Sequence, residues 1–434
     1  MTAREHIENY ESRVREYTNF TVRGIKRTCK ECGPREPGSE AERKAQKLMA
    51  KELESCCDSV QLEPFTLAPR AFLAWVNLSV YLGLLSAALF NFGYALASVL
   101  LLLLALVLVV LEFLMYKQTI DVVYPKKTSQ NVVAVRKPAG GTQRRLIFCG
   151  HADSAYEWLY TYLGDKYFHT TSLLVVVVAV CFVAIIFGFV ASLIAVFTEG
   201  GGVGGLAGLA NRPGWLKVLG YIFAALCIPL LSGLGFKNNK HVVMGANDNL
   251  SGCFTGMAVA KLLGDLDLRL ENTELVVLCS GGEECGLRGA KAFAKAHAEE
   301  YKDAETIFIT LDTIRDYEHM AIYVRDLTGT VKHDPAVANL LRAGGKAAGF
   351  DLPFANLFFG ASDGAAATQA GLRTTSFAAM DPAPAAYYHT RLDTADNLDP
   401  KTVEATLQIL LETVYLFDAE GLAPFEGMTA KMGE

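Results

Sequence analysis

The chain lacks charged residues over three long stretches. No Asp, Glu, Lys or Arg occurs in residues 71–111, 167–198 or 218–236. A helix crosses a bilayer with roughly 20 apolar residues, so the first stretch can hold two spans. Core helices of soluble proteins rarely lose charge on every face for so long. We therefore predict four transmembrane helices in two hairpins, at about 72–91, 94–115, 171–197 and 215–236.

Other absences exclude several classes of protein. The net charge of -6, without a basic stripe, argues against a nucleic-acid partner. The first residues, MTAREHIENYESRVREY, have no apolar core and do not predict a signal peptide. No H-E-x-x-H motif or P-loop is present. The glycine-rich segment 200–211 follows a span instead of a strand, so we interpret it as a flexible exposed loop and not a dinucleotide site.

The cysteines and the basic residues predict the orientation. Ten cysteines show no disulfide framework, as is typical of a reducing compartment. Because each hairpin has two spans, all soluble segments lie on one side of the bilayer. Basic residues flank the spans mainly on that side, which predicts a cytoplasmic catalytic domain in an integral, multi-pass membrane protein. They are Arg70, Lys117, Lys126, Lys127, Lys166, Lys237 and Lys240, against Arg212 and Lys217 on the other side.

The remaining segments alternate between strands and helices. RRLIFCG, ELVVLCS and TIFITL are typical of buried strands, and helices are expected over 1–30, after Ser39, after Ser251 and near 400–417. This pattern predicts an α/β domain with a mostly parallel mixed sheet covered by helices. We predict catalytic segments at 1–70, 117–166 and 238–434, interrupted by transmembrane hairpins at 71–116 and 167–237.

Acidic and histidine residues follow the apolar strands. They occur in FCGHADS, GANDNLSG, CSGGEECG, ITLDTI and YYHTRLDTAD, as His151, Asp248, Glu283 with Glu284, Asp312 and His389. The carboxyl ends of strands in such sheets form binding sites. A two-metal hydrolase needs terminal ligands for each metal, a carboxylate that bridges the two metals and a carboxylate base, and this set contains enough residues for all three roles. Asp153 is positioned to orient the His151 imidazole.

Each motif alone has an ordinary structural explanation. GEE is common at the start of a helix, H-A-D and D-N are frequent in turns, and YYHTRLD fits a surface loop. All five motifs together, at one predicted sheet edge, favour a metal site instead.

The set resembles the co-catalytic zinc exopeptidases, a family that includes aminopeptidase Y, glutamate carboxypeptidase and glutaminyl cyclase. The resemblance extends to CGPREPGSEAERKAQKLMAKEL and covers about 1–70, 117–165 and 238–420. It implies two zinc ions, replaceable by Co²⁺ or Mn²⁺. His151 and Asp312 would hold one ion, Glu284 and His389 the other, and Asp248 would bridge them. Glu283 would be the general base toward a bridging water, Asp153 would orient His151, and Tyr388 would contact substrate.

The function predicted from the sequence is a membrane-embedded aminopeptidase that hydrolyses N-terminal peptide or amide bonds. A second hypothesis is an amidohydrolase for N-acyl or lipopeptide substrates, because the second hairpin lies between His151 and Asp248 in the chain. A third is a glutaminyl cyclase-like transferase, and a fourth is a catalytically dead scaffold, which the complete ligand set disfavours. The run GAAATQAG after Asp363 departs from the bulky residue that is frequent in the family, so it either widens the substrate pocket or packs differently. The native metal, the substrate preference and the oligomeric state stay open.

Overall fold

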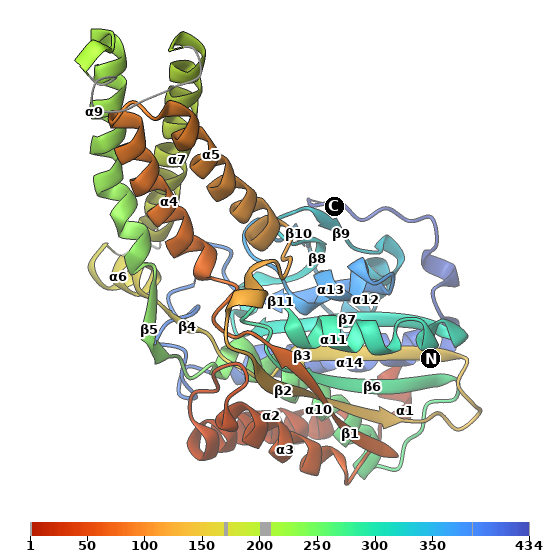
Figure 1. The fold of residues 1–434 in the computed structure, drawn as a ribbon. Helices are drawn as coiled ribbons and strands as arrows, with labels where there is room; N and C mark the ends of the chain where they lie inside the picture. Colours follow the sequence, from red (N-terminus) through yellow and green to blue (C-terminus); the bar gives the residue numbers. More distant parts are fainter. Residues whose placement is uncertain (1, 169–171, 200–209, 384, 434) are drawn as a thin grey trace. The chain divides into compact units, whose positions relative to one another are not determined.

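The chain folds into two compact units, and we describe each by itself. The computed structural model describes residues 2–168, 172–199, 210–383 and 385–433 (Figure 1). Unit 1 comprises residues 1–69, 125–156 and 241–434, and unit 2 comprises 70–124 and 157–240. Most of the glycine-rich segment predicted to be an exposed loop, 200–209, lies outside the described residues.

A mixed sheet forms the centre of unit 1 (Figure 1). Its strand order is β1-β2-β6-β3-β7-β11-β8-β10, with β9 paired to β8. The central strands β6, β3, β7 and β11 run parallel, whereas the pairs β1–β2, β2–β6 and β11–β8 are antiparallel. At the other edge β10 runs parallel to β8. The strands are β1 (Ser59–Leu67), β2 (Lys127–Arg136), β3 (Arg144–His151), β6 (Thr273–Ser280), β7 (Glu305–Ile314), β8 (Met320–Asp326), β9 (Val331–Lys332), β10 (Phe354–Asn356) and β11 (Arg373–Ala379). The predicted α/β class is confirmed.

Both faces of this sheet are covered, because the central strands are apolar on both sides. On β3, Leu146 and Phe148 belong to the larger core cluster, whereas Ile147 and Cys149 belong to a second cluster on the opposite face. Side chains alternate between faces along a strand, so this division follows from the sequence RRLIFCG. The covering helices are α2 (Tyr10–Cys32), α3 (Glu40–Leu53), α10 (Ser251–Asp265), α11 (Arg288–His297), α12 (Pro335–Ala347), α13 (Asp363–Gln369) and α14 (Pro400–Glu420).

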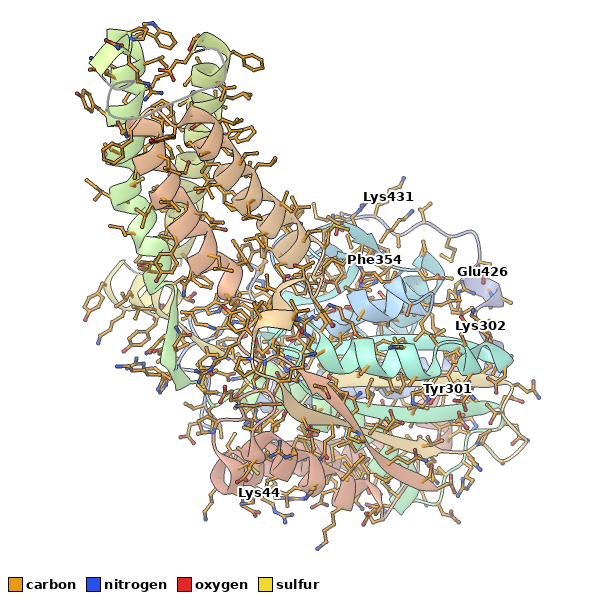
Figure 2. All side chains as sticks on the ribbon, viewed as in Figure 1. Lys44, Tyr301, Lys302, Phe354, Glu426 and Lys431 are labelled. Atoms are coloured by element: carbon orange, nitrogen blue, oxygen red, sulfur yellow. The ribbon has the colours of Figure 1, made fainter. Side chains whose placement is uncertain are left out.

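The N-terminal helices show one predicted feature and one that was wrong. The Ser39 side chain accepts a hydrogen bond from the Glu42 backbone N–H, so Ser39 is the N-cap of α3 as predicted. The buried face of α3 repeats at three and four residues, while Lys44 lies on its outer side (Figure 2). The single helix predicted over 1–30 is instead α1 (Ala3–His6) followed by α2. The chain breaks between them because Asn9 adopts a left-handed conformation, with φ of 55°.

Unit 2 contains four helices that are long and apolar enough to cross a membrane. They cover Ala74–Asn91, Ala95–Leu114, Leu173–Thr198 and Gly214–Gly235, close to the predicted spans. Their elements are α4 (Ala74–Asn91), α5 (Ala95–Leu108), η1 (Val109–Leu114), α7 (Ser172–Thr198), α9 (Gly214–Leu230) and η3 (Leu231–Gly235). Three buried hydroxyls link three of these helices: Ser98 Oγ lies 2.6 Å from Ser86 Oγ and 2.7 Å from Ser192 Oγ. Such contacts satisfy polar groups between apolar helices.

Short elements complete both units. Residues 117–124 and 157–166, which the sequence analysis assigns to the catalytic domain, pack within unit 2. They include η2 (Ile120–Val123) and most of α6 (Leu159–Phe168). A two-stranded sheet of β4 (Tyr156–Trp158) and β5 (Lys237–Val242) forms where the chain passes between the units. Unit 1 also contains the short helices η4 (Ala246–Leu250), η5 (Glu300–Asp303), η6 (Tyr317–His319) and η7 (Ala423–Phe425).

Asp418 near the end of α14 anchors the start of β6, which yields a test of the fold. Its carboxylate accepts hydrogen bonds from the backbone N–H groups of residues 271, 272 and 273, at 2.9, 2.8 and 2.7 Å. Asp418→Ala leaves these donors unpaired, the last of them buried, so we expect a loss of about 2–3 kcal/mol in stability. Thermal unfolding in detergent should show a lower Tm for Asp418→Ala and an unchanged Tm for the exposed control Glu420→Ala. Equal Tm values for both variants would contradict this anchoring role.

Candidate metal centre

An aspartate lies between two histidines at the carboxyl edge of the sheet. Asp248 Oδ1 is 3.1 Å from His151 Nε2, and Asp248 Oδ2 is 3.1 Å from His389 Nε2. His151 ends β3, Asp248 lies in η4, and His389 lies in the loop before α14. All three side chains are buried. One carboxylate therefore faces both imidazoles, one oxygen to each.

The other predicted ligands gather around this trio. Glu284 Oε2 lies 3.3 Å from His389 Nε2, and Glu283 Oε2 lies 3.8 Å from His151 Nε2. Ligand atoms of His151, Asp248 and Asp312 lie within 4.8 Å of one another, and the same holds for Asp248, Glu284 and His389. Ligand atoms of His151, Glu283 and Glu284 form a third group of this kind. The structure thus brings all five motifs to one place, and two of the three groups share Asp248.

The buried carboxylates of the centre outnumber its histidines, so the protein alone does not neutralise their negative charge. Burial raises the pKa of Asp312 to about 7 and that of Glu283 well above its ordinary value. Burial disfavours charge on the histidines too, but the surrounding carboxylates still raise the pKa of His389 to about 10. Burial likewise opposes ionisation of Asp248, yet hydrogen bonds from the two histidines hold its pKa below the ordinary value. The centre needs further positive charge to keep its carboxylates ionised.

Divalent metal ions fit this requirement. The donors are imidazole nitrogens and carboxylate oxygens, which zinc prefers in catalytic sites. Glu284 Oε1 is buried and has no hydrogen-bond partner among the described residues, as expected for an oxygen kept for a ligand. The residues present therefore suit two metal ions, one in each of the two groups that share Asp248.

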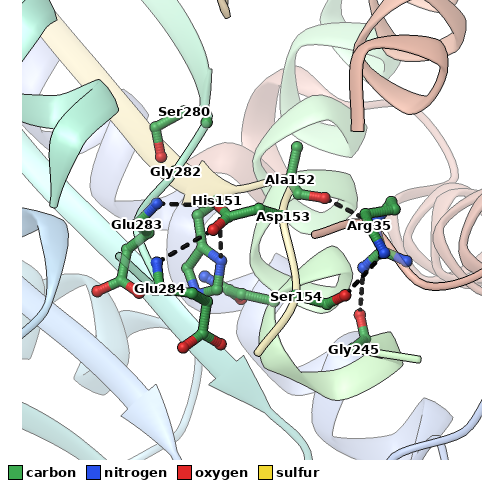
Figure 3. Close-up of polar contacts among 12 residues, drawn as sticks. Arg35, His151, Ala152, Asp153, Ser154, Gly245, Ser280, Gly282, Glu283 and Glu284 are labelled. Atoms are coloured by element: carbon green, nitrogen blue, oxygen red, sulfur yellow. Dashed lines mark hydrogen bonds and ion pairs between the residues drawn. The ribbon is translucent and has the colours of Figure 1, made fainter. Parts of the chain in front are cut away.

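A buried carboxylate behind His151 fixes the turn that carries the two glutamates. Asp153 Oδ1 and Oδ2 accept hydrogen bonds from the backbone N–H groups of Glu283 and Glu284, both at 3.0 Å (Figure 3). Asp153 Oδ1 also lies 3.5 Å from His151 Nδ1. The turn requires glycine at Gly282, where φ is +61°. Asp153, predicted only to orient His151, thus contacts both ligand-bearing segments.

A fully buried guanidinium holds two other segments of the centre together. Arg35 donates to the carbonyl oxygens of Ala152 at 2.6 Å and Gly245 at 2.8 Å (Figure 3). It also donates to the Met244 carbonyl oxygen at 2.8 Å. The Arg35 backbone N–H also donates to Ser154 Oγ at 2.9 Å. Among the described residues Arg35 forms no ion pair, so backbone carbonyl groups surround its charge. It connects the segment after His151 to the segment before Asp248.

Two more buried side chains place Asp248 and Asp312. Asp393 accepts hydrogen bonds from the backbone N–H groups of Asn247, at 2.8 Å, and Asp248, at 3.1 Å. Asn249 donates to the Leu311 carbonyl at 2.8 Å and accepts from the Thr313 N–H at 3.2 Å. These contacts fix the backbone at and before Asp248 and on both sides of Asp312. The Asp248–Asn249 peptide bond is cis.

Sequence reasoning assigned no role to these supporting residues. Arg35 and Asp393 lie within quoted motifs, CGPREPGSE and YYHTRLDTAD, but their partners are distant in sequence. Asp363 was also missed as a buried neighbour: it accepts hydrogen bonds from the Ser280 hydroxyl and, at 3.4 Å, from the Cys149 thiol. Its charge contributes to the raised pKa of Glu283, for which burial is the main cause.

Two further predictions concern the rim of the centre. Tyr388 is half-buried and stacks on His389, with ring centroids 4.0 Å apart, so it lies beside the proposed ligands.

The run after Asp363 forms α13, and Ala365, Ala366 and Ala367 are buried. A Cβ at Gly364 would lie 2.5 Å from Ser376 Oγ. The small side chains at 364–367 therefore allow α13 to pack closely on the sheet.

Comparisons with known proteins agree with this geometry. Residues 233–414 match the family model of peptidase family M28. This segment is therefore similar to the peptidases of family M28. The match confirms the resemblance to zinc exopeptidases and makes the chain a zinc-dependent hydrolase of the peptidase type. No curated protein sequence matches the chain.

Solved structures share the fold of this chain at low sequence identity. An aminopeptidase from Aneurinibacillus sp. strain AM-1 is 14% identical with a TM-score of 0.53, covering 93% of this chain and 95% of that one. The zinc aminopeptidase BSAP from Bacillus subtilis gives 14% and 0.53, with coverage of 92% and 94%. Glutaminyl cyclase from Fimbriiglobus ruber gives 12% and 0.53, with coverage of 92% and 95%. At such identities the likeness establishes the fold alone.

The contacts of Arg35 predict a role in metal affinity. Arg35→Met removes the hydrogen bonds between the two ligand-bearing segments, and loss of such support typically weakens metal binding about 10–100-fold. We expect a shift of this size in a zinc titration of the metal-free protein, and a smaller shift in Arg35→Lys, which keeps the charge. The control Arg43→Met removes a guanidinium that binds the Gly38 and Thr128 carbonyls. Equal zinc affinity in all three variants and the wild type would refute the role.

Proposed function

We propose that the chain is a membrane-embedded, two-zinc aminopeptidase that hydrolyses N-terminal peptide or amide bonds. One observation carries the proposal: Asp248 lies 3.1 Å from both His151 and His389, with one oxygen toward each. A carboxylate in this position suits a bridge between two ions. The match of residues 233–414 to peptidase family M28 supports a peptidase-type reaction.

The proposed ligand sets follow the two groups around Asp248. His151 and Asp312 would hold one zinc ion, Glu284 and His389 the other, with Asp248 shared. Co²⁺ or Mn²⁺ would suit the same donors. Bound zinc would act as a Lewis acid toward the substrate carbonyl and the attacking water. Asp153 would keep His151 and the glutamate turn aligned.

Glu283 is proposed as the general base. Its carboxylate faces the centre beside His151, and its backbone is fixed by Asp153. Burial raises its pKa, which favours uptake of a proton from water during attack on the carbonyl carbon. The protonated carboxyl would then donate that proton to the leaving amine nitrogen as the C–N bond breaks. Glu283 returns to its ionised form, so one base serves both steps.

Tyr388 is proposed as a substrate contact. It stacks on His389 at the rim of the centre. Burial raises the pKa of its hydroxyl well above the ordinary value, and the carboxylates of Asp248 and Glu284 add to the effect. The hydroxyl therefore keeps its proton at neutral pH. A protonated hydroxyl is able to donate a hydrogen bond to the oxygen that gains negative charge during attack.

The lipid bilayer is proposed as a further partner. The four apolar helices of unit 2 are each long enough to cross it. With two spans in each insertion and most basic flanking residues on one side, the catalytic domain would face the cytoplasm. Membranes containing the protein should retain it in the pellet after alkaline carbonate extraction. Release into the supernatant would contradict membrane insertion.

Glutaminyl cyclase chemistry is the second candidate, because the Fimbriiglobus ruber glutaminyl cyclase has the same TM-score as the aminopeptidases. Aminoacyl-amide substrates and peptides with N-terminal glutamine separate the two reactions. Release of a free amino acid supports the aminopeptidase, whereas formation of a cyclic N-terminus without peptide cleavage supports the cyclase.

The role of Glu283 leads to a prediction about catalysis. Glu283→Gln keeps the size of the side chain but removes its basicity, so kcat should fall by about 10²–10⁴-fold. Zinc content and Tm should remain close to the wild type, because Glu283 belongs to neither proposed ligand set. Glu300→Gln, an exposed change in the same unit, is the control. Near wild-type kcat in Glu283→Gln would rule out this residue as the base.

A further inference from the structure

The segment that follows the second apolar helix exposes large apolar side chains. Val122 and Val123 in η2 are 79% and 75% exposed, and Met115 is 41% exposed. Single exposed apolar residues are ordinary on a protein surface. Here two adjacent valines occur within ten residues of Leu114, where the apolar helix ends.

The exposure of the valines belongs to an ordered turn. Glu112 is fully buried, and its Oε1 accepts hydrogen bonds from the backbone N–H groups of Thr119, at 2.8 Å, and Ile120, at 3.0 Å. The Thr119 hydroxyl donates to the same oxygen. Tyr116 packs on Phe72, with ring centroids 4.5 Å apart. The turn is therefore tied to the helix end, and Val122 and Val123 project outward from a fixed backbone.

Positive charge accompanies these valines. Lys117 and Lys126 are exposed and form no ion pair among the described residues, whereas Lys127 pairs with Glu36 at 3.6 Å. Asp121 is the only acidic residue between Met115 and Lys127. Apolar side chains next to lysines suit the boundary of a bilayer that contains anionic lipid.

We propose that residues 115–124 form a membrane-surface anchor, which inserts Val122 and Val123 among the headgroups of anionic lipids, with Lys126 following two residues later in the chain. The anchor continues directly from the helix Ala95–Leu114, so it rests on the proposed membrane insertion of that helix. Lipid is the occupant that this continuity and the positive charge favour. A turn held by Glu112 loses little conformational freedom on insertion, which favours a stable contact.

A fluorescent amino acid incorporated at single positions tests the anchor in lipid nanodiscs. The positions are Val122, Val183 and Lys302 of the full chain. Val183 is 56% exposed near the middle of α7 and reports membrane insertion itself. Lys302 is exposed in unit 1 and serves as the aqueous reference (Figure 2). Quenching is measured with lipids that carry a spin label at the headgroup or deep in the acyl chain.

The proposal predicts headgroup-label quenching at position 122 at least about threefold above that at position 302. Position 183 should be quenched by the deep label. Quenching at 183 without quenching at 122 above the 302 value would overturn the anchor and leave the spans intact. Absence of quenching at both positions would overturn the membrane insertion on which the anchor rests.

A comparison of two lipid compositions tests whether the anchor prefers anionic lipid. Quenching at position 122 should be stronger in discs containing phosphatidylglycerol than in pure phosphatidylcholine discs. The double substitution Lys117→Gln and Lys126→Gln should abolish this difference, whereas Lys302→Gln should preserve it. Equal quenching in both lipids for the unsubstituted lysines would contradict a preference for anionic lipid.

Discussion

The burial of several carboxylates at one edge of the sheet is the constraint on which the catalytic unit depends. Asp248, Glu283, Glu284 and Asp312 share a small volume with His151 and His389, the two histidines that the described part of the chain places there. Ionised groups in such surroundings are costly unless they are paired or bound to a metal. The raised pKa values of Glu283 and Asp312 express this cost. Divalent metal ions would lower this cost by neutralising the carboxylates. The excess of buried negative charge therefore explains both the raised pKa values and the proposed binding of zinc.

The same constraint explains the buried polar side chains around the centre. The segments that carry His151, Asp248, Asp312 and the two glutamates are each fixed by a residue from another part of the chain. Arg35 contacts segments 117 and more than 200 residues away, and Asp393 reaches back to Asp248. These contacts are between side chains and backbone groups, so they fix the path of the chain itself. A ligand set held in this way loses little freedom when an ion binds.

Sequence reasoning identified the ligands because their chemistry is local. A histidine or carboxylate that follows an apolar run marks the carboxyl edge of a sheet, and the strands that carry His151 and Asp312 near their carboxyl ends were recognisable from their composition. The four apolar helices were equally clear from the absence of charge. The residues around the ligands were not, because Arg35 resembles any arginine in a polar loop until its partners are known.

Other differences between the sequence-based predictions and the structure depend on backbone conformation and long-range contacts, which hydrophobic periodicity does not indicate. The helix predicted over 1–30 is interrupted at Asn9, whose left-handed conformation no periodicity indicates. The close packing of α13 at Gly364 against Ser376 was equally invisible in the sequence, because Ser376 lies 12 residues further along the chain. Long-range packing thus decided the details that composition left undetermined.

The number of zinc ions bound per chain tests the central claim most directly. Elemental analysis of the purified full-length protein should give about two zinc ions, and about one in His389→Ala, which removes a ligand of a single proposed site. Fewer than one zinc ion in the wild type, or one ion that is unaffected by His389→Ala, would contradict a two-metal centre bridged by Asp248.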